Sequence, residues 1–340
     1  MKEVAREAGV HQTTVSLALR DHHSLPAATR ARIRAVADRL GYRPNPLVSA
    51  LMSVRRRGRA SREGSTLAFL TAYPTRDGWR RSANYQYLFE ATSARARELG
   101  YRQEAFWLTE PGMTADRMRR ILLARGIRGV LVCPLPSALH VLDFDFNDFA
   151  GVALGYTLHR PALDQVAIDY YGILQMAVGR VRERGFRRIT FFTSRQIDER
   201  VNHLSLGAYL AERRIDGSRL LEPFLCRDEE PAAIFRWITE RKPDAIITSV
   251  HREYQMLDGL VRKMDRKRRP RLYAVDARPD AREPGVVQAL DDQARAAVDL
   301  VTSRLERGEF GPPRMPQTVL VRGTWREEKV VPQASAGSLS

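Results

Sequence analysis

Cysteine is scarce in this chain of 340 residues, which has only Cys133 and Cys226, far apart in apolar segments. This count excludes a disulfide scaffold and a cysteine-rich metal site, so both thiols are expected to be buried and reduced. No apolar segment approaches the ~20 residues that span a bilayer, and no signal peptide precedes the first predicted helix. We therefore expect a cytoplasmic protein.

Motifs of common catalytic sites are also absent. The sequence has no P-loop, no dinucleotide-binding glycine motif and no nucleophile elbow, and its seven histidines show no metal-ligand spacing. We therefore predict a protein that is not an enzyme and that uses no cofactor or metal ion.

Basic charge is concentrated at the N-terminal end of the chain. Residues 1–60 hold twelve Lys or Arg and four Asp or Glu, a net charge of +8, which is half of the whole-chain value of +16. Neutralisation of nucleic-acid phosphates requires such a concentration. The rest of the chain is long enough for a second globular unit.

Residues 4–19 have the pattern of a helix-turn-helix. Apolar residues at helical spacing give each of two short helices a buried face, and Gly9 supplies the turn between them. A third amphipathic helix is predicted over residues 28–40. Helix pairs without a nucleic-acid role are also common, but the second helix here turns a mostly polar face outward, which can bind base edges and phosphates in a major groove. The outward positions are Gln12, Thr13, Ser16, Leu17 and Arg20.

The pattern V-A-x-x-A-G-V-x-x-x-T-V-S-x-x-L at residues 4–19, with L-G-Y-R-P-N at residues 40–45, closely resembles the DNA-binding headpiece of the LacI/GalR (lactose-repressor/galactose-repressor) family of bacterial transcription regulators. The resemblance implies a homodimer that reads a near-palindromic operator with one headpiece per half-site. It implies a nucleoid-associated repressor whose operator affinity is modulated by a small molecule. The alternative is a small-molecule-binding protein with a degenerate headpiece that no longer reads DNA.

Carried over by position, Gln12 and Thr13 are the implied base readers, and Thr14 and Ser16 the implied phosphate contacts. The chain departs from the family at three places. It begins at Met1-Lys2 without the usual capping Thr, and His11 replaces a capping Ser, which is expected to weaken the start of the second helix. Leu17 replaces a base-reading Arg of the lactose repressor and can contact only an apolar surface such as a thymine methyl, so the operator sequence should differ. The remaining implied DNA contacts are Arg20, Tyr42, Asn45, Leu51 and Arg55.

Residues 46–54 are predicted to form a short hinge helix after a headpiece of residues 1–45. Asn45 is a good N-cap and Pro46 fits the first helical position, but so short a helix is marginal in water. The resemblance implies paired hinge helices in the minor groove, with Leu51 wedged between base steps. The alternative is an ordinary linker. Residues 55–65 are predicted to be a charged linker, in which Arg55 adds a phosphate contact.

From residue 66, short apolar strands alternate with amphipathic helices, which indicates an α/β core of doubly wound parallel sheets. Phrases such as E-L-G-Y at residues 98–101 resemble the family's effector-binding core, whose two lobes are similar to periplasmic sugar-binding proteins. The expected first lobe is 66–186 plus 291–315, the second is 187–290 plus 316–330, and 331–340 is a disordered tail. The predicted strands are 67–72, 103–108, 129–133, 151–155, 189–193, 220–226, 245–248 and 271–275, and the predicted helices are 85–99, 115–124, 173–184, 205–213, 232–240, 254–264 and 291–306.

An effector, possibly a carbohydrate, is expected in the cleft at the carboxyl ends of these strands. Aromatic rings can stack on a sugar while polar groups bind its hydroxyls. By resemblance, Tyr85 is the aromatic of the first core helix, and Asp276 is an acidic residue that contacts sugar hydroxyls. Asp169 matches a recurrent Asp of the family, for which a structural role is the alternative. Trp79 and Tyr85 could equally be core residues. The full candidate set is Tyr73, Arg76, Trp79, Tyr85, Asp169, Arg200, Asn202, His203 and Asp276.

The resemblance weakens at two places in the cleft. Leu204 stands where the family has a sugar-binding Arg, and Ser249-Val250 replace the usual Asn-Asp pair. Arg200, Asn202 and His203 are the candidates to replace the lost Arg. The expected effector is therefore an unusual sugar or a sugar acid.

Overall fold

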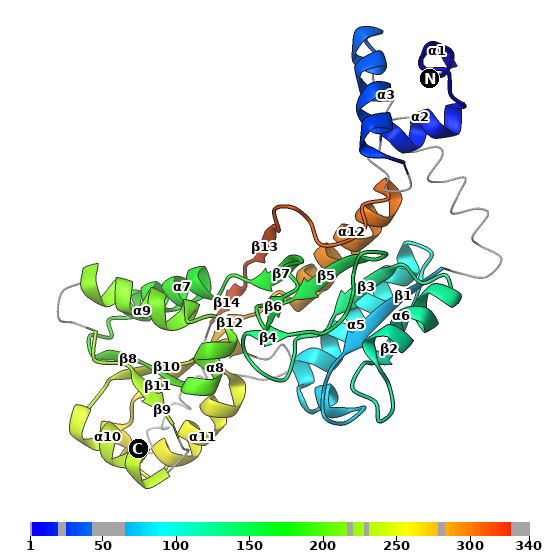
Figure 1. Ribbon diagram of the computed structural model, residues 1–340. Helices are drawn as coiled ribbons and strands as arrows, with labels where there is room; N and C mark the ends of the chain where they lie inside the picture. The colour runs from blue at the N-terminus through cyan, green and yellow to red at the C-terminus, as the bar shows by residue number, and fades with distance from the viewer. Residues whose placement is uncertain are drawn as a thin grey trace, which may run out of the picture.

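The computed structural model describes residues 2–19, 25–42, 65–215, 220–227, 231–277 and 283–327 (Figure 1). Three N-terminal helices precede an α/β core that contains two six-stranded sheets. The expected fold class, a helical headpiece followed by a two-lobed core, is confirmed. The predicted hinge helix 46–54, most of the linker 55–65 and the tail 331–340 lie outside the described residues, as do Arg20, Asn45, Leu51 and Arg55.

The headpiece is formed by α1 (Lys2–Glu7), α2 (Gln12–Leu19) and α3 (Ala27–Arg39). Gly9 between the first two helices has φ +62°, a left-handed conformation that glycine adopts without strain. The three helices share one small core, whose members are Val4, Ala5, Ala8, Val15, Ala18, Ile33, Val36 and Ala37. The predicted packing of two short helices around one apolar cluster is therefore confirmed, and α3 completes it.

The first lobe contains a parallel sheet in the order β13-β7-β5-β3-β1-β2. Its strands, in chain order, are β1 (Thr66–Thr71), β2 (Arg102–Trp107), β3 (Gly129–Val132), β5 (Ala150–Leu154), β7 (Asp164–Ile168) and β13 (Thr318–Val321). The remaining elements of this lobe are the short helix η1 (Gly78–Arg81), the helices α5 (Ala83–Glu98), α6 (Ala115–Ala124) and α12 (Leu290–Arg307), and the strand pair β4 (His140–Val141) and β6 (Leu158–Arg160).

The second lobe contains a sheet in the order β14-β12-β11-β10-β8-β9, parallel except for β14. Its strands are β8 (Ile189–Ser194), β9 (Phe224–Cys226), β10 (Ala245–Thr248), β11 (Arg271–Ala277), β12 (Gly285–Val287) and β14 (Thr324–Arg326). Its helices are α7 (Tyr170–Glu183), α8 (Arg195–Arg200), α9 (Leu204–Ile215), α10 (Pro231–Arg241), α11 (His251–Val261) and the short η2 (Arg266–Arg268).

The core elements agree with the sequence patterns to within three residues, with two kinds of exception. The strand expected over 220–226 is reduced to Phe224–Cys226. The other exceptions are short elements that were not predicted: the strands β4, β6, β7, β12 and β14 have at most five residues each, and the helices α8, η1 and η2 have at most six. A short strand inside a sheet owes its conformation to its neighbours more than to its own composition.

The chain crosses between the lobes at other places than expected. Helix α7 was assigned to the first lobe, but Ile173, Leu174 and Ala177 pack in one cluster with strands β8 and β11, and Figure 1 shows α7 beside α9. The first crossing therefore lies at Asp169 and not at 186–187. Segment 318–321 was assigned to the second lobe, but β13 pairs in parallel with β7 of the first, and the chain returns with β14. Both errors follow from missing β7, which precedes α7 and supplies the edge that β13 joins.

Cys133 and Cys226 are both buried thiols outside any disulfide, as predicted. Among the described residues, no helix is long and apolar enough to cross a membrane. No cluster of three metal-ligating side chains occurs in the described ranges either.

Candidate functional site

The surface of α2 in the headpiece has the composition expected of a groove reader. Val15 and Ala18 are buried against α1 and α3, which fixes the opposite face outward. On that face Thr13 is exposed, and Gln12 and Leu17 are half-buried. Thr14 and Ser16 are also half-buried, so the structure leaves all five predicted side chains of α2 partly accessible. Residues 12–19 carry no charge, so α2 offers amide and hydroxyl groups.

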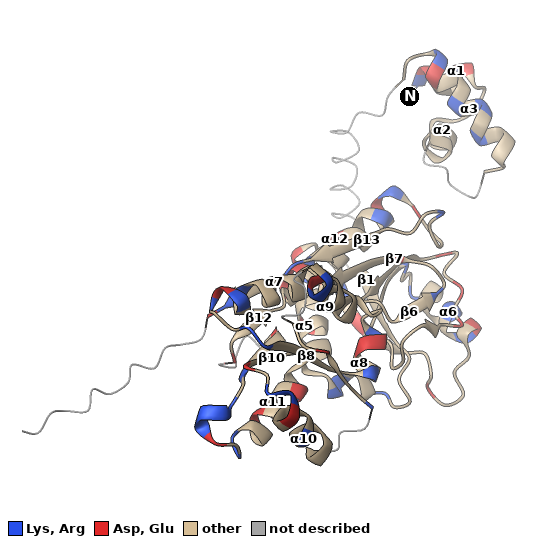
Figure 2. Cartoon of the chain, turned by 90° about the vertical axis from the view of Figure 1, so that its left-hand side faces the viewer, with Lys and Arg blue, Asp and Glu red and all other residues tan. Residues whose placement is uncertain are grey.

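Basic residues lie on the neighbouring helices α1 and α3 (Figure 2). Some of them hold the headpiece together: Arg32 of α3 donates to the carbonyl of Ala8 (3.1 Å), and Arg39 pairs with Glu7 of α1 (3.1 Å). Tyr42, a predicted DNA contact, packs against the headpiece core. Helix α3 has four Arg and one Asp, whereas the two basic and two acidic residues of α1 cancel, so the headpiece places a neutral recognition helix beside one cationic helix.

His11 takes the position of the missing cap residue at the start of α2. Its Nδ1 atom accepts the backbone N–H of Thr13 at 3.4 Å and lies 3.0 Å from the Thr13 hydroxyl. The first bond is long, but an acceptor for the second N–H of a helix is the function of an N-cap side chain. The imidazole thus replaces part of the cap and holds the Thr13 side chain, and the length of its bond agrees with the expected weakening of this helix start.

A cavity of about 410 Å³ lies between the two lobes of the core. Its walls are the segments that follow the carboxyl ends of strands in both sheets, together with the starts of α5, α7 and α11. Parallel α/β sheets bind ligands at this edge, because side chains from several strands converge there. The cavity therefore occupies the position predicted for an effector.

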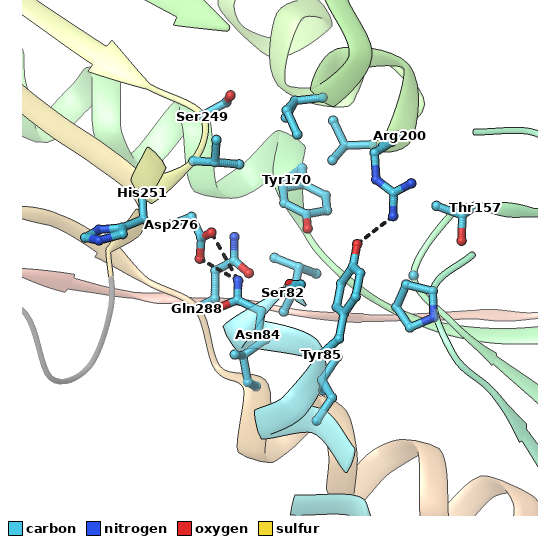
Figure 3. Close-up of a pocket in the computed structure, with 18 of the residues that line it drawn as sticks. Ser82, Asn84, Tyr85, Thr157, Tyr170, Arg200, Ser249, His251, Asp276 and Gln288 are labelled. Atoms are coloured by element: carbon cyan, nitrogen blue, oxygen red, sulfur yellow. Dashed lines mark hydrogen bonds between the residues drawn. The ribbon is translucent and has the colours of Figure 1, made fainter. Parts of the chain in front are cut away.

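One end of the cavity is built around the carboxylate of Asp276 at the end of β11. Asn84 at the start of α5 donates its amide to both carboxylate oxygens, at 3.1 Å each, so this contact joins the two lobes. Gln288, Ser249 and His251 line the same end (Figure 3). His251 is held by the buried Glu283, whose carboxylate lies 2.7 Å from its Nδ1 atom.

The other end is built around Arg200 at the end of α8. Its guanidinium donates to the hydroxyl of Tyr85 (2.6 Å) and to the carbonyl of Pro136 (2.7 Å), both from the first lobe. Burial raises the pKa of the Tyr85 hydroxyl, and the neighbouring Arg200 opposes this rise only in part. Burial also raises the pKa of Tyr170, and it raises that of Tyr156 to about 12. These hydroxyls therefore stay protonated and neutral near pH 7.

The structure brings together three of the predicted effector residues, Tyr85, Arg200 and Asp276, in the wall of the cavity. The others do not line it, although Tyr73 lies behind the wall and interacts with Arg200. Trp79 is only 1% exposed and packs against the rings of Phe69 and Phe89.

The remaining candidates have structural or peripheral positions. The Tyr73 hydroxyl donates to the carbonyl of Pro134 (2.9 Å), and Arg76 lines a different depression. Asp169 caps α7 by accepting the N–H of Gly172 (2.9 Å), the structural role left open for it. Asn202 and His203 are exposed, and His203 pairs with Asp198 (2.6 Å).

Sequence reasoning missed Asn84, Tyr170 and Gln288, which also line the cavity. Asn84 and Tyr170 each stand next to a residue that was selected, Tyr85 and Asp169. The available signal was that a helix that follows a sheet edge brings some of its first residues to the cleft. Gln288 follows β12, which was itself not predicted.

Comparisons with known proteins agree with both parts of the chain. Residues 1–45 match the family model of bacterial regulatory proteins of the lacI family. The regulator PtxS of Pseudomonas plecoglossicida is 46% identical over 69 residues, which are 20% of this chain and 19% of PtxS. The regulator RafR of Escherichia coli is 30% identical over 147 residues, 43% of this chain and 38% of RafR. These matches thus span well under half of either relative's length.

The fold is similar to that of solved structures over almost the whole chain. The Lac repressor dimer bound to operator and the anti-inducer ONPF aligns with a TM-score of 0.54 and 15% identity, covering 96% of this chain and 97% of that one. At this identity the likeness concerns the fold alone.

Proposed function

Because residues 1–45 match the family model of bacterial regulatory proteins of the lacI family, we propose that the chain is a member of this family, a homodimeric, sequence-specific transcription regulator that acts as a repressor. Its headpieces bind double-stranded operator DNA at the nucleoid, in the cytoplasm. A sugar or sugar derivative bound between the two core lobes modulates its affinity for that operator.

The observation that carries this proposal is the geometry of the headpiece. Burial of Val15 and Ala18 leaves Gln12 and Thr13 at the N-terminal end of α2, where a recognition helix meets base edges. The Gln12 amide suits the donor and acceptor pair of an adenine edge. The arginines of the neighbouring helix α3 supply positive charge, which the DNA phosphates attract.

The cavity between the lobes supports the proposal that a small molecule modulates operator affinity. Asn84 and Asp276 join the lobes at one end, and Tyr85 and Arg200 join them at the other. A ligand at these four residues would change the contacts between the lobes. Since effector and operator affinities are linked through one conformational equilibrium, each ligand must alter the affinity for the other.

Selection of operator sequences from random double-stranded DNA tests the proposal. The full chain is expected to enrich a near-palindromic sequence, with affinity that falls steeply as salt is raised. A variant with Gln12 and Thr13 both changed to Ala is the control, since the folded headpiece should keep non-specific binding but lose the enrichment. If the native chain enriches no sequence, the protein is instead a small-molecule-binding protein with a degenerate headpiece.

A further inference from the structure

Arg200 is a half-buried cation whose hydrogen-bond partners are neutral. It donates to the Tyr85 hydroxyl and to the carbonyl of Pro136, and the neutral Tyr73 hydroxyl also interacts with it. Within the described residues no carboxylate pairs with this guanidinium, whereas Arg195 on the same helix pairs with Glu199. Removing a cation from water without an anion nearby is unfavourable. A guanidinium has five N–H donors, so Arg200 can hold a bound anion and keep both of its present contacts.

Further donors are gathered around Arg200. The Tyr170 hydroxyl, which faces the centre of the cavity in Figure 3, has no hydrogen-bond partner among the described residues. The buried Thr157 hydroxyl accepts the N–H of Leu135 (2.7 Å), which leaves its own hydrogen to donate. Since the tyrosine hydroxyls stay protonated, this end of the cavity presents a guanidinium and neutral donors.

The opposite end of the cavity has different chemistry. Asp276 is a carboxylate, and Asn84 and Gln288 add amide groups that both donate and accept (Figure 3). A carboxylate accepts hydrogen bonds from sugar hydroxyls but repels a second anion. Four charged residues line the cavity: one acidic residue, Asp276, and three arginines, Arg81, Arg200 and Arg252. Positive charge therefore exceeds negative charge in the lining.

We propose that the cavity selects an anionic polyhydroxylated ligand, a sugar acid or a sugar phosphate, with its anionic group at Arg200 and its hydroxyls at Asp276 and Asn84. This inference rests on the proposed function only in taking the cavity as the effector site. The position at which the family carries a sugar-binding Arg holds Leu204 in this chain, which does not line the cavity. Arg200 is therefore a separate recognition residue, one helix earlier.

Isothermal titration of the full chain tests the proposal. The probes are hexonates, hexuronates and hexose phosphates, each compared with its neutral parent hexose at the same ionic strength. At least one anionic probe should bind about tenfold or more tightly than its parent, because a charge-assisted hydrogen bond contributes about 1.5–3 kcal/mol. The relative affinities of the carboxylates and phosphates then identify the anionic group.

The variant Arg200→Gln should lower affinity for that anionic probe at least tenfold more than it lowers affinity for the neutral parent, because only the anionic probe loses a charge-assisted hydrogen bond. Arg195→Gln is the matched control: Arg195 lies on the same helix and pairs with Glu199 in solvent (3.0 Å), so its loss should change neither affinity. Thermal unfolding of each variant shows whether the core stays folded.

The proposal is overturned if no anionic probe binds, if a neutral hexose binds as tightly as its acid, or if Arg200→Gln keeps full affinity. Operator selection separates this result from the proposed function. A chain that enriches an operator but prefers neutral sugars contradicts only the anion preference. A chain that binds a sugar acid but enriches no DNA contradicts only the regulatory role.

Discussion

The headpiece and the core of this protein resemble LacI-type regulators to different degrees. Residues 1–45 match the lacI family model in sequence, whereas the core resembles the Lac repressor in fold at only 15% identity. A recognition helix must fit the fixed shape of a DNA groove, so its turn and its small apolar core have few alternatives. A cleft between two lobes can exchange its side chains without altering the sheets that carry it. Ligand choice can thus diverge while DNA reading keeps its geometry.

The largest expected effect is a loss of core stability, and it concerns a buried ion pair of the first lobe. Arg304 of α12 donates to Asp164 of β7 (2.5 Å) and to the carbonyl of Gly311 (2.8 Å), and it is 4% exposed. Changing Arg304 to Met leaves the buried carboxylate unpaired and should lower the free energy of unfolding of the core by about 3–5 kcal/mol. Denaturant unfolding measured by core tryptophan fluorescence checks this.

Arg307→Met on the same helix is the control. Arg307 pairs with Glu309 (2.5 Å), but both side chains are about half exposed, so its loss should cost roughly 1 kcal/mol or less. Equal losses in the two variants would show that the buried pair has no special role in holding α12 to the first lobe.

The next effect belongs to the headpiece alone. Ile33 of α3 is completely buried in the small core that joins the three helices. Changing it to Ala should lower headpiece stability by roughly 2–5 kcal/mol, because the cavity it leaves lies in a cluster with few other large side chains. Operator affinity should be lost while titration of the effector gives the native value. Reduced effector affinity in this variant would show that the two regions do not fold independently.

The contrast between the regions also explains which features could be predicted from the sequence. Helical periodicity around Gly9 was enough to place α1 and α2, because local spacing determines which face is buried. The strands β7 and β12 could not be found in the same way. Each is short, and each is extended because neighbouring strands supply its hydrogen bonds. The lobe crossing at Asp169 was misplaced for the same reason.

In the cleft, the rule that ligands bind at strand ends identified the correct edge but not the orientation of each side chain. Trp79 follows β1 as predicted, but the short helix η1 turns it into the core against Phe69. Arg200, Asn202 and His203 were the three candidates to replace the family's sugar-binding Arg. Only Arg200, at the end of α8, reaches the cavity and binds Tyr85, whereas Asn202 is exposed. These outcomes depend on tertiary packing, which periodicity does not contain.

A smaller effect tests base reading without unfolding the headpiece. Gln12 is half-buried at the start of α2, and its amide is expected to contact a base edge. Gln12→Ala should weaken binding to the selected operator by about 1–3 kcal/mol and relax the sequence preference at one position of each half-site. Binding to random DNA should stay the same. Gln255→Ala, which removes an exposed amide of the second lobe, is the control and should change neither affinity.

The smallest expected effect concerns His11, where the headpiece departs from its family. Its imidazole accepts the Thr13 N–H, and its carbonyl accepts the N–H groups of Thr14 (2.9 Å) and Val15 (3.2 Å). His11→Ala removes the side-chain acceptor and should cost about 1 kcal/mol or less of helix stability. Hydrogen exchange at the start of α2 should then accelerate up to about fivefold, because exchange follows the local free energy of opening. His11→Asn, which restores an ordinary cap, should slow exchange instead. If His11→Ala exchanges at the native rate, the long bond contributes nothing, and the headpiece tolerates the lost cap through its three-helix core alone.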